Sequence, residues 1–190
     1  MREPLKCGGY KMEIGGIPTL IATATSTNVT NAAFTSGLTS TYFKYMFVFT
    51  DIGPATDSNT LTMNFSTDGG SNYNITKTST FFRAQHNGSS TDLDYQTGND
   101  LAQSTSYQPI SADLGSGADE STSGVLYFWT PSNTTFIKHW MSRFNCHHAS
   151  DYSNDMYSQG YANTASAINA IDFKMSSGNF DGVIQMYGIK

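Results

Sequence analysis

The chain has few charged residues and almost no glutamate. Only 13% of its 190 residues are charged, and glutamate occurs only as Glu3, Glu13 and Glu120. Serine and threonine, in contrast, make up roughly a quarter of the chain, and aromatic residues a further 13%. Thr, Tyr, Phe and Val suit the pleated surface of a strand. This composition predicts one all-β domain, because a chain of this length can bury a core of its own.

Cysteine is also scarce, with Cys7 and Cys146 alone. Two cysteines do not make the disulfide framework of a small secreted scaffold, although one bridge between them stays open. No apolar run reaches the length of a membrane span, and the first residues lack the apolar core of a signal peptide. We therefore expect synthesis in a cytoplasm and no association with a membrane.

Basic residues are too few and too dispersed for a nucleic-acid partner. The formal net charge is −5, and the ten Lys and Arg are spread from Arg2 to Lys190. A protein that binds a row of phosphates gathers positive charge on one face. The sequence therefore disfavours nucleic-acid binding.

The first residues differ in character from the rest of the chain. Residues 1–17 contain Pro4 and four glycines, which interrupt any long regular element. We interpret them as an N-terminal arm that can clasp a neighbour. Residues 18–190 are then the single folded domain.

Alternating polar and apolar residues predict a series of short strands. In 42–50, Phe43, Tyr45, Phe47 and Phe49 share one face, which we assign to the core. The opposite face carries Tyr42, Lys44, Met46 and Val48, which we expect a loop or a partner to cover. The other predicted strands are 19–25, 59–66, 73–84, 125–130, 134–143, 155–162, 167–175 and 183–189.

Turn residues indicate how some of these strands connect. Asp68-Gly69-Gly70 predicts a hairpin between 59–66 and 73–84, and Pro131-Ser132-Asn133 predicts one between 125–130 and 134–143. The polar stretch 85–124 is typical of a long exposed loop, with only short pairing at 101–103 and 107–110. Strands so short and so spaced predict an antiparallel β-sandwich or jelly roll.

Metal-ligand residue types gather near one strand, at His139, Cys146, His147 and His148. Cysteine and histidine are good ligands for zinc or copper. Adjacent residues of a strand point to opposite faces, however, so this set converges poorly. We interpret these side chains as ordinary strand and loop residues, and we expect no metal and no cofactor.

Catalytic patterns are weak. The sequence has no Gly-x-Ser-x-Gly elbow to present a nucleophile. Asp92 with Asp94, or Asp119 with Glu120, could hold calcium or act as the carboxylate pair of a glycosidase. Neither pair has the alternating oxygen ligands and turn glycine of a calcium loop. We interpret these acids as solvated loop residues and predict that the chain is not an enzyme.

Several tyrosines are candidates for contacts with a ligand or with another subunit. Tyr10, Tyr152, Tyr157 and Tyr161 could stack against the face of a sugar ring, or they could form core edges and subunit contacts. We favour core-edge and subunit contacts over sugar binding. The candidate interface residues are Tyr10, Tyr42, Met46, Val48, Tyr152, Tyr157 and Tyr161.

Several stretches of the chain resemble small virion structural proteins of tailed bacteriophages, particularly those that infect marine cyanobacteria and other marine bacteria. The order and spacing of these stretches carry the resemblance, which covers residues 30–190. The stretches are Phe34 to Tyr45, Phe47 to Phe49, Gly53 to Asp57, Ser66 to Asn74, Thr130 to Thr135, Phe173 to Asn179 and Tyr187 to Ile189.

The resemblance implies a β-sandwich or jelly-roll unit on the surface of a virion, used as a head decoration, cement, fibre or tail part. It transfers no catalytic residue. The implied partners are major capsid or tail proteins and further copies of the chain, with a trimer as one arrangement. The alternative is a receptor- or glycan-binding adhesin domain of a tail fibre, whose partner would be a glycan of the host surface. Head and tail locations both stay open.

Overall fold

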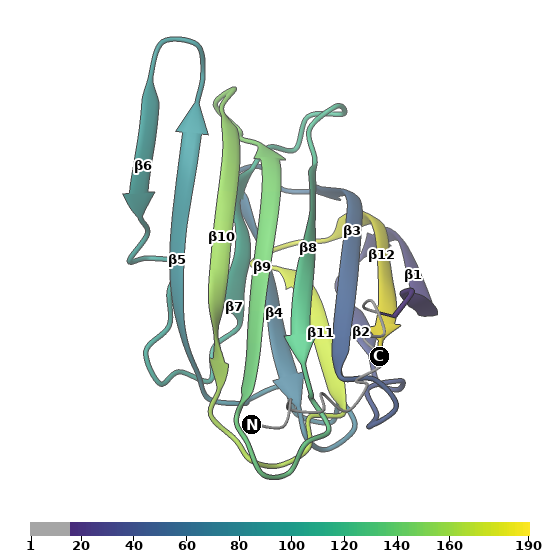
Figure 1. The fold of residues 1–190 in the computed structure, drawn as a ribbon. Coiled ribbons are helices and arrows are strands. Elements are labelled where there is room, and N and C mark those ends of the chain that lie inside the picture. Colours follow the sequence, from purple (N-terminus) through teal and green to yellow (C-terminus); the bar gives the residue numbers. More distant parts are fainter. Residues whose placement is uncertain (1–15) are drawn as a thin grey trace, which may run out of the picture.

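The chain folds into two antiparallel sheets that pack face to face (Figure 1). The computed structural model describes residues 16–190, which form twelve strands and no helix. The strands are β1 (Thr19–Val29), β2 (Ala32–Phe34), β3 (Lys44–Pro54), β4 (Asn59–Ser66), β5 (Lys77–His86), β6 (Thr91–Tyr95), β7 (Gln108–Leu114), β8 (Thr122–Trp129), β9 (Lys138–His147), β10 (Ser153–Ala162), β11 (Ala170–Met175) and β12 (Phe180–Ile189).

The two sheets differ in size. Eight strands form the large sheet in the order β1-β12-β3-β8-β9-β10-β5-β6, and four form the small sheet in the order β2-β11-β4-β7. The predicted all-β sandwich is therefore confirmed. Residues 16–190 include no helix of the length and apolarity that crossing a bilayer requires.

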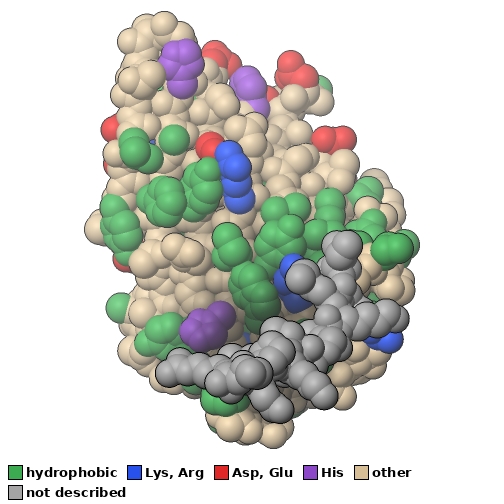
Figure 2. Space-filling view, viewed as in Figure 1, with side chains coloured by type: hydrophobic (Ala, Val, Ile, Leu, Met, Phe, Trp, Pro, Cys, Tyr) green, Lys and Arg blue, Asp and Glu red, His purple; other side chains and the backbone are tan. Residues whose placement is uncertain are grey.

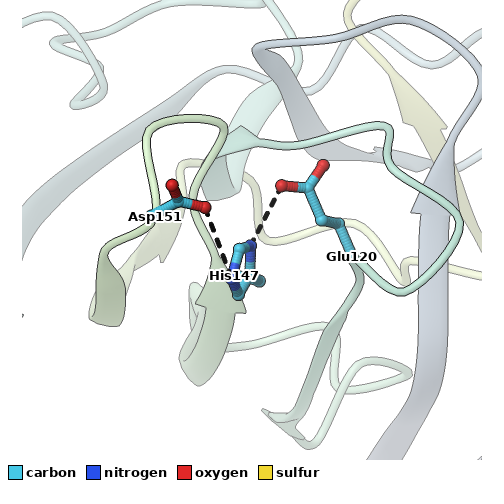
Figure 3. Close-up of side chains that lie close together, drawn as sticks. All are labelled: Glu120, His147 and Asp151. Carbon is cyan, nitrogen blue, oxygen red and sulfur yellow. Dashed lines mark hydrogen bonds and ion pairs between the residues drawn. The ribbon is translucent and has the colours of Figure 1, made fainter. Parts of the chain in front are cut away.

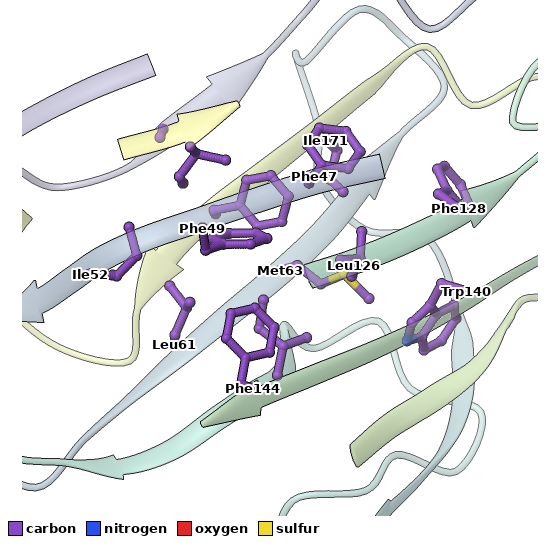
Figure 4. Packing of buried hydrophobic residues seen from close by; sticks show 14 of the residues in the cluster. Phe47, Phe49, Ile52, Leu61, Met63, Leu126, Phe128, Trp140, Phe144 and Ile171 are labelled. Atoms are coloured by element: carbon purple, nitrogen blue, oxygen red, sulfur yellow. The ribbon is translucent and has the colours of Figure 1, made fainter. Parts of the chain in front are cut away.

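Aromatic rings fill the space between the sheets (Figure 4). Phe49 of the large sheet meets Phe173 of the small sheet edge to face, with ring centroids 5.0 Å apart. Phe128 and Phe65 stack across the same gap at 4.7 Å. Edge-to-face and offset arrangements are the favoured geometries of aromatic pairs. The core is therefore held by rings that come from both layers.

The prediction for 42–50 is correct at its centre and wrong at its start. Tyr45, Phe47 and Phe49 are buried as expected, but Phe43 is 70% exposed. Regular pairing of β3 begins only at Lys44, opposite Ile189 of β12 and Trp129 of β8. Phe43 lies at a bend just before β3, where its backbone still bonds Ile189 O and Thr130 N but its side chain extends beyond the covered part of the sheet.

The predicted hairpin between 59–66 and 73–84 is wrong. β4 has the predicted bounds, yet it pairs with β11 and β7 in the small sheet, while β5 pairs with β10 and β6 in the large sheet. The segment between them crosses from one sheet to the other. Asp68 organises its start by accepting hydrogen bonds from Ser66 Oγ at 2.6 Å and Asn72 N at 2.9 Å, which lower the pKa of Asp68 to about 2. The turn residues thus predicted that the chain changes direction here. They did not predict which sheet it enters next.

The stretch 85–124 is not one long loop. It contains β6, the buried strand β7 and the start of β8. The short pairing predicted at 107–110 is confirmed as the start of β7, but polar residues concealed the length of this strand, because Gln108 and Ser111 are themselves buried and hydrogen-bonded. Gln108 Nε2 donates to Asn99 O at 3.0 Å, and Ser111 Oγ lies 3.1 Å from Thr122 Oγ1. Internal partners allow such residues to occupy a core strand.

The remaining predictions of strands hold. β8 and β9 form the second predicted hairpin, and β10, β11 and β12 occupy the last three predicted ranges within a few residues. Of the predicted arm, residues 1–15 lie outside the described residues, and Cys7 with them. Cys146 is buried, and burial raises the pKa of its thiol to about 12.

Candidate functional site

The small sheet covers only one side of the large sheet. The other side, here called the outer face, looks toward the reader in Figure 2, where apolar side chains are spread across it. Alternation along each strand determines which residues lie there: on β9, for example, His139 and Met141 are exposed while Trp140 and Ser142 are buried. The apolar residues of this face on the six strands from β12 to β5 include Met46, Val48, Phe82, Val125, Tyr127, Trp129, Met141, Tyr157, Tyr161 and Tyr187.

These residues form continuous rows across the strands. Met46 of β3 lies opposite Tyr187 of β12 and Tyr127 of β8, and Tyr127 lies opposite Met141 of β9. Directly opposed side chains of neighbouring strands have Cβ atoms about 5 Å apart and pack against each other. The row therefore makes one apolar band over the middle of the sheet.

A second row carries a charged pair that is already neutralised. Arg143 of β9 donates to both carboxylate oxygens of Asp155 of β10, at 3.0 and 2.7 Å. Its guanidinium also lies 5.1 Å from the ring centroid of Tyr157, and Tyr157 stacks on Phe82 of β5 at 4.7 Å. The bonds from Arg143 lower the pKa of Asp155 and keep it ionised. The pair thus adds no net charge to the face.

A groove of about 450 Å³ lies on the outer face where β8, β9, β10 and β5 run side by side. Its lining includes Trp129, His139 and Tyr161, each from a different strand. Gln103 Nε2 donates to the hydroxyl of Tyr161 at 3.1 Å and so holds that ring in place. The groove offers flat rings and neutral hydrogen-bonding groups.

The structure brings together four of the seven candidate interface residues. Met46, Val48, Tyr157 and Tyr161 share the outer face. Tyr42 does not, because it precedes β3 and packs edge-on against the buried Tyr45 with ring centroids 5.9 Å apart.

The other two candidates lie elsewhere. Tyr152 sits in the turn between β9 and β10, with its ring 5.4 Å from that of His148. Tyr10 lies outside the described residues.

The four candidate metal ligands are not brought together. His139 lies near the start of β9 and His147 at its end, eight residues or roughly 26 Å apart along a strand. Cys146 points into the core, whereas His147 points outward. His148 turns toward Asp113, with its Nε2 3.8 Å from Asp113 Oδ2. The opposite orientation of adjacent strand residues is as the sequence predicted.

A different cluster forms around His147 (Figure 3). Its Nδ1 lies 3.1 Å from Glu120 Oε1, and its Nε2 lies 4.0 Å from Asp151 Oδ1. The two carboxylates approach opposite nitrogens of one ring, so the imidazole bridges them. A chelating site would require all three side chains to face a common point. Asp151 is 92% exposed. The cluster is therefore a histidine that bridges carboxylates from two loops.

The candidate carboxylate pair on β6 is engaged in the fold. Asp92 and Asp94 share a face of β6, opposite Gln85 and Arg83 of β5. Arg83 Nε donates to Asp94 Oδ1 at 3.2 Å, and Arg83 Nη1 reaches Asp113 Oδ2 of β7 at 3.0 Å. Arg83 thus ties the edge strand β6 to β7 of the small sheet, and Asp94 has a structural role as its partner.

Sequence reasoning missed six of the ten apolar residues named for the outer face, Tyr187 among them. Tyr127, Trp129 and Val125 alternate with the buried Leu126 and Phe128, so their common side could have been found from the pattern of β8. Phe82 and Met141 gave the same signal on β5 and β9. What the pattern of one strand does not show is that these three strands are neighbours of β3 and β10.

Comparison of the chain with known protein families, with curated proteins and with solved structures finds no match.

Proposed function

We propose that this chain is a non-catalytic structural protein on the outer surface of a tailed phage particle, and that it assembles through the outer face of its large sheet. The observation that carries the assembly role is the apolar band around Met46, Tyr127 and Met141, which lies on the side of the large sheet away from the small sheet and is partly exposed among the described residues. Contiguous exposed apolar surface of this kind marks interaction sites in soluble proteins. The phage setting comes from the sequence resemblance.

The chemistry of the described residues fits a structural role. The His147 cluster bridges loops, Asp94 is ion-paired, and burial raises the pKa of the Cys146 thiol to about 12. A catalytic nucleophile or acid needs a free reacting atom in a cleft, with a base or a second acid beside it. None of these three groups, all within 16–190, meets that requirement.

Quantitative mass spectrometry of purified particles tests the proposal. The chain should be present at a fixed copy number relative to the major capsid protein after density-gradient purification. A protein of the host cytoplasm measured in the same gradient fractions is the control. Recovery of the chain only from the soluble lysate would refute the virion role.

A glycan-binding adhesin is the second candidate function, and the groove beside Trp129 and Tyr161 favours it. Flat aromatic rings with nearby hydroxyl and amide groups suit the apolar face and the hydroxyls of a sugar. A glycan array should then show saturable binding that Trp129→Ala and Tyr161→Ala both abolish. Absence of saturable binding to any glycan would remove this candidate.

A further inference from the structure

We propose that the outer face binds the outer face of a second copy of this chain, which gives a twofold dimer rather than a trimer. The inference rests on the proposed use of this face for assembly and names its partner. It does not depend on the virion setting.

The amino-acid composition of the outer face resembles that of the centre of a protein–protein interface. Tyr, Trp, Phe, Met and Arg are enriched at interface centres, whereas Lys, Glu and Asp are depleted there. Tyr127 and Met141 lie near the middle of the outer face, and Met141 is 41% exposed. Gln159 of β10 lies directly opposite Met141, and Asn145 lies nearer the rim. Polar groups beside aromatic and thioether side chains are usual in a protein interface.

Two copies of the chain should repel each other less at the outer face than at other parts of their surfaces. The chain carries a net charge of −5, so two copies repel each other at most orientations. On the outer face the carboxylate of Asp155 is bound by Arg143, and Lys44 lies 5.2 Å from the ring centroid of Tyr127. The acids Asp92 and Glu120 lie on an edge strand and a loop. Two copies that meet through their outer faces therefore bring little negative charge together.

The size of the face is sufficient for a stable dimer. Strands lie about 4.8 Å apart and rise about 3.3 Å per residue, so six strands of eight residues span about 29 by 26 Å. That area is close to the roughly 800 Å² per partner of a standard interface. The six strands from β12 to β5 carry all of the apolar residues named above.

Use of the same face by both copies determines the symmetry of the dimer. Two sheets pack well face to face, about 10 Å apart and with strands within about 30° of alignment. When the same patch serves both copies, the contact is isologous and closes as a pair. Met141 lies on β9, near the middle of the six strands from β12 to β5, so it should contact its own symmetry mate or a close neighbour of it.

Light scattering after size-exclusion chromatography, with protein loaded from about 1 to about 100 µM, tests the dimer. The wild-type chain should elute with twice the 20.7 kDa of one chain. Met141→Arg places a charge at the centre of the face without touching the core, and should weaken association at least about tenfold. The matched control is Phe136→Arg, which adds the same charge at a residue that is 68% exposed and lies in the loop before β9. The control should remain a dimer, and circular dichroism should show that both variants are folded.

Three results would overturn the inference. The wild-type chain could be monomeric at all concentrations, it could have three times the mass of one chain, or Met141→Arg could associate as strongly as the wild type. A monomer that is nevertheless present in purified particles would refute the dimer alone. A dimer that is missing from particles would refute the virion role alone.

Discussion

Phe47 and Phe43 differ in burial although they lie four residues apart. Phe47 is fully buried and packs edge-on against Phe173 at 5.4 Å, whereas Phe43 is 70% exposed. Phe47→Ala should lower the free energy of unfolding by about 3 to 5 kcal/mol, because it leaves a cavity between the sheets. Phe43→Ala, the matched control, should change it by less than about 0.5 kcal/mol. Equilibrium denaturation in urea measures both, and equal losses would contradict the placement of Phe43.

Lys77 is a fully buried lysine at the start of β5. Its Nζ donates to Asn64 Oδ1 at 2.6 Å and to Ile75 O at 2.7 Å, so both partners are neutral. Burial without an opposite charge disfavours the ammonium form and lowers the pKa of Lys77 to about 7. The bond to Asn64 ties the large sheet to β4 of the small sheet.

The depressed pKa of Lys77 makes stability dependent on pH. The unfolded chain, with a lysine pKa of about 10.4, binds more protons than the folded chain above pH 7. The free energy of unfolding should therefore rise with pH from about 7 to 8.5, by up to about 1.4 kcal/mol per unit. Above about pH 8.5 the unfolded Cys146 thiol ionises while the folded one does not, which opposes this rise. In Lys77→Met this slope should disappear. Urea denaturation at several pH values measures it.

A matched control separates Lys77 from the other titrating groups. Lys190→Met removes a lysine that is exposed at the end of the chain, so it should keep the wild-type slope. If Lys77→Met also keeps the slope, the buried ammonium is not the cause.

At the scale of the element, β10 lies between β9 and β5 and depends on a glycine for that position. A Cβ at Gly160 would lie 2.7 Å from the ring of the buried Trp140 and would press against the backbone oxygen of Thr78. Gly160→Ala should therefore lower the free energy of unfolding by about 1 to 3 kcal/mol, as overpacking of a core does.

Gly98→Ala is the control for that substitution. Nothing lies within 4 Å of a Cβ at Gly98, so the free energy of unfolding should change by less than about 0.5 kcal/mol. Thermal melting of the two variants in parallel measures the difference. An unchanged melting temperature for Gly160→Ala would show that β10 can move away from Trp140.

Two connections show what local sequence determines about an element. Pro131-Ser132-Asn133 joins β8 to β9, which are neighbours in one sheet, and the prediction was right. Asp68-Gly69-Gly70 has equally strong turn residues, yet the chain continues to Lys77 in the other sheet. The difference arises at Asn64 of β4, whose Nδ2 donates to the carbonyl oxygens of Tyr73 and Thr105 and whose Oδ1 accepts from Lys77. Turn residues determine only that the chain reverses direction. Which sheet it enters next depends on the bonds of Asn64, which join segments distant in sequence.

At the scale of the whole molecule, the small sheet packs on one side of the large sheet, and no strand of residues 16–190 packs on the other. Four strands cannot cover both sides of eight, so apolar residues of β3, β8 and β9 remain on the surface (Figure 2). The virion role and the twofold dimer are two consequences of this one feature, and mass spectrometry and light scattering test them separately. The same face also carries the groove at Trp129, so a glycan and a second copy would compete for it.

Composition and alternation were sufficient to predict the all-β class, the antiparallel sandwich and most strand positions, because these depend on each residue and its near neighbours. The pairing of β1 with β12, which joins Thr19 to Gly188, depends on the whole chain. So does the outer face, where Met46, Tyr127, Met141 and Tyr157 come from four strands. Alternation assigns each of them to one side of its own strand. Only the order of strands in the sheet places those sides next to one another, and that order is set by long-range packing of the core.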